Sequence, residues 1–96
     1  MEQATGHIDK TEIFNFSGLK QELKIRGYSL GTIETYCHYN EQLLRFARKR
    51  PLEVTNQDVR NYLEHLFDKN KSRATIRSAY NALYFYYTTS LGKKVI

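Results

Sequence analysis

The chain has 96 residues and a formal net charge of +5, and Cys37 is its single cysteine. A chain of this length forms one domain with a modest core, and a single cysteine excludes an internal disulfide. The first residues contain no cationic segment followed by an apolar run. No stretch of about 18 consecutive apolar residues occurs either, so we expect neither a signal peptide nor a membrane span. These bounds favour a soluble, intracellular domain in the cytoplasm.

The first half of the chain is expected to hold two helices after a partly loose segment, 1–15. The first helix has apolar positions at Phe16, Leu19 and Leu23, and Gly27 suits the left-handed position that follows many helices. The second helix begins after Ser29, a favourable N-cap, and Pro51 is expected to stop it. Its buried stripe is predicted to comprise Ile33, Tyr36, Cys37, Asn40, Leu43, Leu44 and Ala47, with Tyr28 stapling Ile33.

Two more helices are expected in the second half. "VTNQDV" predicts a helix start with Thr55 as N-cap and Asp58 in the capping-box position, stapled by Val54 and Val59. The buried stripe of this helix is predicted as Val59, Tyr62, Leu63, Leu66 and Phe67. Ser72 caps the last helix, which Gly92 ends and which should bury Ile76, Ala79, Tyr80, Leu83 and Tyr86 or Tyr87. The pattern predicts an all-α domain, a compact four-helix bundle with short loops.

One phrase occurs twice, as "SLGTIETY" near residue 30 and as "SRATIRSAY" near residue 75. Each copy has Ser, then Thr three residues later, then Ile, then a Tyr on the next turn. Ordinary capping explains part of this pattern, since a Ser N-cap alone contributes about 1 kcal/mol. Topology adds a functional explanation, because short connections make neighbouring helices antiparallel and so bring the second and fourth helices roughly parallel.

Both copies should then lie at one end of the bundle, together with the basic residues that precede them. Helix N-termini bind phosphate oxygens readily, Ser and Thr donate to phosphates, and Arg reaches phosphates or base edges. We therefore expect a DNA-binding surface formed by Lys24, Arg26, Ser29, Thr32, Thr35, Lys69, Lys71, Ser72, Arg73, Thr75, Arg77 and Ser78.

A second basic run, Arg45 to Arg50, lies at the opposite end in this arrangement. Two interpretations stay open for it. It either contacts nucleic acid or complements the macrodipole at the end of the second helix, where cations typically contribute 0.3–1 kcal/mol each.

Three segments in order resemble the N-terminal core-binding (SAM-like) domain of tyrosine recombinases, the phage-integrase family. They are "RGYSLGTIETYCHYNEQLLRFA", "PLEVTNQDVRNYLEHL" and "KSRATIRSAYNALYFYYTTSLG". The resemblance as a whole covers about residues 16–92. The resemblance implies a four-helix SAM-like core-binding domain that clamps one face of a recombination site through the starts of its second and fourth helices, with a role in DNA integration. The chain has Asn81 and Tyr84 where family members often carry further basic residues.

The resemblance also implies a C-terminal catalytic domain that supplies the Arg, His and nucleophilic Tyr residues. The last residues, 93–96, would begin the linker to that domain, so we expect a binding domain and not an enzyme. Its expected partners are double-stranded DNA and the catalytic domain of the parent recombinase, and the isolated domain is expected to be monomeric, without a membrane partner.

Two rival functions remain. One is a helix-turn-helix regulator, although the aromatic fourth helix must be largely core. The other is a helical protein-interaction module that docks through Tyr84–Tyr87, a cluster too aromatic for one helix to bury alone. No cofactor or metal is expected, because the spacing of the histidines and Cys37 fits no zinc site, and Asp58 and Glu64 are a cap and a surface acid.

Overall fold

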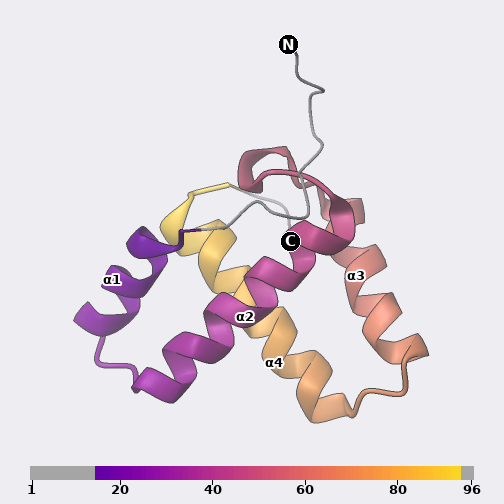
Figure 1. Ribbon diagram of the computed structural model, residues 1–96, viewed down its shortest axis with the longest axis horizontal. Helices are drawn as coiled ribbons and strands as arrows, with labels where there is room; N and C mark the ends of the chain where they lie inside the picture. Colours follow the sequence, from indigo (N-terminus) through magenta and orange to yellow (C-terminus); the bar gives the residue numbers. More distant parts are fainter. Residues whose placement is uncertain (1–14, 94–96) are drawn as a thin grey trace.

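All four expected helices are present. The computed structural model describes residues 15–93, in which the helices are α1 (Ser17–Ile25), α2 (Leu30–Ala47), α3 (Asn56–Asp68) and α4 (Arg73–Tyr84) (Figure 1). A 3-10 turn, η1 (Pro51–Glu53), joins α2 to α3, and α4 continues into a π-helical segment, η2 (Phe85–Ser90). No strand occurs between residues 15 and 93, which confirms the all-α fold. The segments expected to be loose (1–15) and to begin a linker (93–96) lie outside the described residues, apart from Asn15 and Lys93.

The helix boundaries follow the expected caps. The side chains of Ser29, Thr55 and Ser72 each accept a hydrogen bond from the backbone N–H three residues later, and Asp58 completes the capping box of α3. Gly27 has a φ of +83° directly after α1, as expected for a helix end. One boundary differs, because α2 ends at a left-handed Arg48 and not at Pro51, which instead opens η1.

The core comprises one cluster of apolar side chains from every helix: Phe16, Leu19, Leu23, Ile33, Leu43, Leu44, Val54, Val59, Tyr62, Leu66, Ala79, Leu83, Tyr86 and Tyr87. Two side chains expected in the core are exposed, Phe67 (70%) and Tyr80 (40%). Phe67 lies in the last turn of α3. In α4 the core face follows Ala79, Leu83 and Tyr87, and Tyr80 lies to one side of this line. Both Tyr86 and Tyr87 are buried, so the chain does bury half of the aromatic cluster 84–87.

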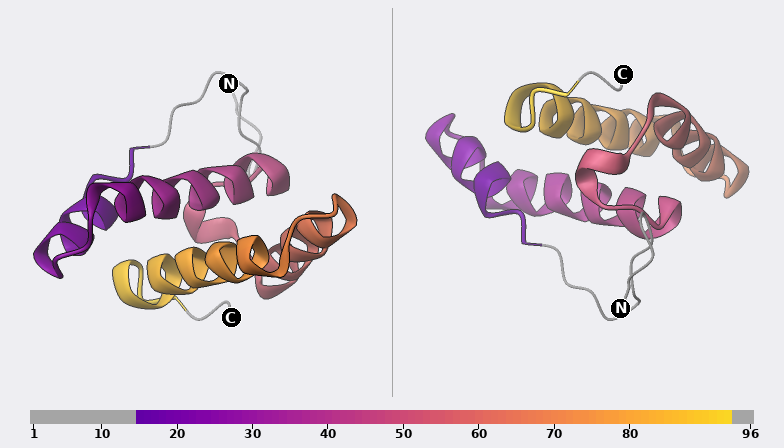
Figure 2. Two further views of the ribbon diagram at one scale, coloured as in Figure 1. Left: turned by 90° about the horizontal axis from the view of Figure 1, so that it is seen from below. Right: turned by 90° about the horizontal axis from the view of Figure 1, so that it is seen from above.

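The crossing of α2 and α4 organises the bundle. The two helices cross and do not run parallel as expected, with α1 packed beside α2 and α3 beside α4 (Figures 1 and 2). The amide of Asn40, which is 1% exposed, donates to the carbonyl oxygens of Tyr36 at 2.9 Å and Ala82 at 3.0 Å. Ala79 and Ala82 are fully buried, and their small side chains allow the helices to approach. Despite the crossing, α2 and α4 both begin at the lower edge of Figure 1, where α1 and α3 end.

No helix within residues 15–93 is both long enough and apolar enough to cross a membrane.

Candidate nucleic-acid interface

The doubled phrase forms two matched helix starts. The Oγ of Ser29 accepts from the Thr32 backbone N–H at 3.2 Å and donates to Thr32 Oγ1 at 3.1 Å. In the second copy, Ser72 Oγ accepts from the Thr75 N–H at 3.1 Å and donates to Thr75 Oγ1 at 3.1 Å. Because each Thr hydroxyl accepts the Ser proton, its own hydrogen stays free to donate to a ligand.

Small residues follow both caps at the same position. Gly31 and Ala74 each occupy the second residue of their helix and are exposed. The N–H groups of a first helical turn have no partner within the helix, and Ser29 and Ser72 satisfy only those of Thr32 and Thr75. An oxyanion can therefore approach the remaining amides of either helix without meeting a bulky side chain at this position.

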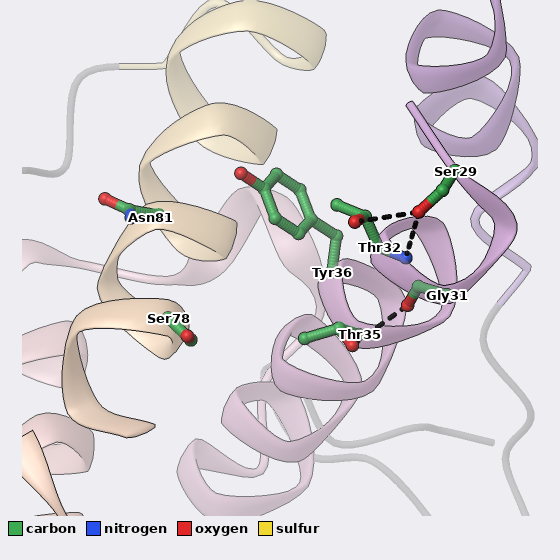
Figure 3. A pocket seen from close by; sticks show the side chains of 7 residues that line it. All are labelled: Ser29, Gly31, Thr32, Thr35, Tyr36, Ser78 and Asn81. Carbon is green, nitrogen blue, oxygen red and sulfur yellow. Dashed lines mark hydrogen bonds between the residues drawn. The ribbon is translucent and has the colours of Figure 1, made fainter. Parts of the chain in front are cut away.

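A groove of about 570 Å³ lies between the N-terminal half of α2 and the middle of α4. Its lining is polar and uncharged, and consists of Ser29, Gly31, Thr32, Thr35, Tyr36, Ser78 and Asn81 (Figure 3). The Thr35 hydroxyl donates to the Gly31 carbonyl at 3.0 Å, and the Tyr36 ring projects between the two helices. Hydroxyl-bearing residues from two helices thus line one open space.

Three aromatic rings connect the start of α2 to the end of α4. The ring centroids of Tyr28, Tyr36 and Phe85 lie 5.8–6.0 Å apart, so each ring contacts the other two. Burial raises the pKa of the Tyr36 hydroxyl, and the nearby Tyr28 raises it further, so Tyr36 stays neutral and able to donate. These ring contacts fix the position of Ser29, at the start of α2, relative to the end of α4.

Arg26 takes part in this cluster. Its guanidinium lies 5.4 Å from the centroid of the Phe85 ring, and its Nε contacts Glu22 Oε2 at 2.7 Å. The positive charge of Arg26, which was expected at the DNA surface, is therefore paired with Glu22 and lies against the ring of Phe85. Lys24 does not line the groove either, because it lies with Lys20 at a separate hollow on α1.

The charge of α4 and the loop before it is uniformly positive. Every charged side chain after Asp68 is basic: Lys69, Lys71, Arg73, Arg77, Lys93 and Lys94. Arg73 and Arg77 are exposed, and no ion pair of either is found among residues 15–93. The residues expected to bind DNA thus separate into a groove set (Ser29, Thr32, Thr35 and Ser78) and a cationic set at the start of α4 (Lys69, Lys71, Ser72, Arg73, Thr75 and Arg77).

The second basic run makes contacts within the fold. Lys49 Nζ donates to Asp58 Oδ2 at 2.7 Å and so links the end of α2 to the start of α3, while Arg45 pairs with Glu41 at 2.9 Å. Burial alone would raise the pKa of Asp58. The hydrogen bonds from Lys49 and Thr55 outweigh burial and lower the pKa instead. Within this run, Lys49 therefore stabilises the junction between α2 and α3.

Sequence reasoning missed three groove residues: Gly31, Tyr36 and Asn81. Asn81 follows Ser78 by three residues and so shares its helix face, which is a signal that the sequence contains. Tyr36 matches a core position by spacing, and its place at the groove depends on how α2 and α4 cross.

Within residues 15–93, no three His, Cys, Asp or Glu side chains gather in a way that could hold a metal ion.

The fold and the site define a small all-α domain in which two helices begin with matched caps and a polar groove extends from the start of α2 to the middle of α4. A family model described as "Phage integrase, N-terminal SAM-like domain" matches residues 16–96, and the chain belongs to this family. The match confirms the resemblance expected from the three sequence segments. It connects the chain with integrases through their N-terminal domain, and it includes no catalytic domain. No significant match was found among curated proteins or among solved structures.

Proposed function

We propose that the domain binds duplex DNA as the core-binding part of a site-specific tyrosine recombinase, through the N-termini of α2 and α4. One observation carries the proposal: two helices begin with the same cap geometry, and the start of α2 opens onto a hydroxyl-lined groove that reaches the middle of α4. DNA phosphates are the ligand that such amides and hydroxyls fit. The acid-free charge of α4 supplies the electrostatic attraction.

The two helices contribute different contacts. At α2, the free amides of the first turn and the hydroxyl of Thr32 would hold backbone oxygens. At α4, Arg73 and Arg77 would add ionic contacts to phosphates or base edges. The Arg, His and Tyr groups of recombination chemistry would come from the C-terminal catalytic domain of the parent recombinase. This domain would then contribute DNA binding and no catalysis. We expect it to be a monomer that is located inside the cell, with the DNA.

The test is an amide NMR titration of the chain with a generic duplex at low salt. Shifts should concentrate at residues 29–35 and 69–78. Affinity measured over a range of salt should follow a log–log slope of about −4 to −5, as about five phosphate contacts require. Chemical-shift changes confined to other surfaces, or an affinity that does not change with salt concentration, would refute the proposal.

Charge variants sharpen this test. Arg73→Ala and Arg77→Ala should each weaken binding, and each should reduce the magnitude of the salt slope by about 0.9. The matched control is Arg60→Ala, because Arg60 is exposed on α3 and bonds only locally, to Asn56 at 2.9 Å. Equal losses in all three variants would point to net charge alone and not to a surface on α4.

Burial within the aromatic cluster argues against one of the two rival functions, the protein-interaction module. A docking surface made of Tyr84–Tyr87 is not available, since Tyr86 and Tyr87 are buried in the core. A helix-turn-helix regulator would place α4 alone at the DNA. Thr32→Ala in α2 distinguishes this alternative, because the variant should weaken binding only if both helix starts contact the duplex.

A further inference from the structure

Two exposed tyrosines stack on each other along α4. The rings of Tyr80 and Tyr84 lie 6.1 Å apart between centroids and 18° from parallel, and they are 40% and 48% exposed. They are one helical turn apart, so each ring orders the other without help from another helix. Large aromatic side chains that are held in place yet left open to solvent are typical of contact surfaces.

The pair continues the line of the two arginines. The spacing from Arg73 to Arg77, Tyr80 and Tyr84 is four, three and four residues, which places all four side chains along one face of α4. This stripe (Arg73, Arg77, Tyr80 and Tyr84) extends for about 16 Å at the rise of an α-helix. That length corresponds to roughly five base pairs of duplex.

The chemistry of the stripe selects its partner. One half is cationic, the other half offers neutral rings with hydroxyl groups, and no acidic residue follows Asp68 in the sequence. A protein partner held by two tyrosines would gain little apolar burial, and two arginines precede this pair on the same face of α4. A DNA duplex matches both halves, because phosphates face the arginines while sugars and thymine methyl groups give apolar surface for the rings.

We propose that the stacked pair Tyr80–Tyr84 is a DNA-contacting extension of the Arg73–Arg77 surface and supplies a salt-insensitive part of the affinity. This inference rests on the proposed function. The arginines release counterions when they neutralise phosphates, whereas neutral tyrosines release none. The two halves of the stripe therefore leave different signatures when affinity is measured against salt.

The experiment measures the affinity of the full chain for a fluorescently labelled duplex, by anisotropy, at several salt concentrations. Tyr80→Ala/Tyr84→Ala should weaken binding by about tenfold at every salt concentration and leave the slope unchanged. Tyr80→Phe/Tyr84→Phe should retain most of the affinity if the rings make the contact. Phe67→Ala is the control, because it removes an exposed aromatic ring (70%) from α3, outside the stripe.

A second measurement uses the unaltered chain, so that a folding defect in the variants cannot decide the outcome. The ring proton resonances of Tyr80 and Tyr84 should shift on addition of duplex, while those of Phe67 should not. Unshifted tyrosine rings, unchanged affinity in the double Ala variant, or a change in its salt slope would each overturn the inference. If the arginine variants still weaken binding in that case, the proposed function stands without it. If the unaltered chain binds no duplex, both fail.

Discussion

Asn40 offers the sharpest test of the packing that sets the groove. Its amide nitrogen donates to the carbonyls of Tyr36 and Ala82, and its Oδ1 is buried without a hydrogen-bond partner. Asn40→Ala removes two hydrogen bonds of about 1 kcal/mol each and leaves a space worth about 1 kcal/mol more. Loss of the unpartnered Oδ1 returns about 1 kcal/mol, so the variant should be about 2 kcal/mol less stable.

Thermal melting followed by circular dichroism measures this loss, which for a domain of this size lowers Tm by about 8–16 °C. Two further substitutions at Asn40 separate the contributions. Asn40→Leu keeps the volume and should stay within about 1 kcal/mol of the parent, because both carbonyls lie inside helices. Asn40→Asp should be the least stable, because it places a buried carboxylate against two carbonyl oxygens. An Asp variant as stable as the parent would refute the orientation of the amide and the role we assign to it.

Two further predictions concern ionisable groups. Because the pKa of Asp58 is lowered by its contacts with Lys49 and Thr55, the stability it contributes is present above the unfolded value near 4 and is lost as pH falls through the lower folded pKa. Asp58→Asn should make the melting temperature depend less steeply on pH in the acid range. An equally steep dependence in the variant would contradict the assignment. Burial, with a smaller effect of Tyr39, raises the pKa of Tyr62 to about 12, so the fold should lose stability as pH rises from about 10 to 12. Tyrosinate absorbance should follow this unfolding, and titration of every tyrosine near pH 10 without unfolding would contradict it.

Local chemistry made the helix starts predictable. Ser29, Thr55 and Ser72 each bond to a backbone group three residues away, so the pattern that identifies each cap lies within one turn of sequence. The capping box between Thr55 and Asp58 is predictable for the same reason. The sequence-based expectations were accurate at these positions because no distant residue is involved.

The crossing of α2 and α4 could not be predicted in the same way. The bond from Asn40 to Ala82 joins residues 42 positions apart, and no short pattern indicates it. The exposure of Tyr80 depends on the same geometry, because the crossing determines which face of α4 meets the core. Lys49 resembled an unpaired helix-end cation in sequence, and only the fold brings Asp58 to it. Errors in the predicted site therefore occur where long-range packing decides the outcome.

Pairing with acids separates the structural cations from those that could make the proposed DNA contacts. Glu22 lies one turn before Arg26 in α1, and Glu41 lies one turn before Arg45 in α2, so local contacts engage both arginines. Sequence patches of like charge do not reveal this difference, because "RFARKR" and "KNKSRATIR" each contain four basic residues and no acid.

The two copies of the repeated phrase differ in charge at two positions, one of which is the fifth helical residue, Glu34 in α2 and Arg77 in α4. The first helical residue is Leu30 in α2 and Arg73 in α4, although the caps that precede them are alike. In the proposed complex the amides and hydroxyls at the start of α2 would accordingly act as neutral donors, and the arginines of α4 would make the ionic contacts. Since phosphate neutralisation sets the salt dependence of DNA binding, α4 should dominate the attraction to DNA. The role left to α2 in the proposed complex would be to fix how the duplex lies across the groove.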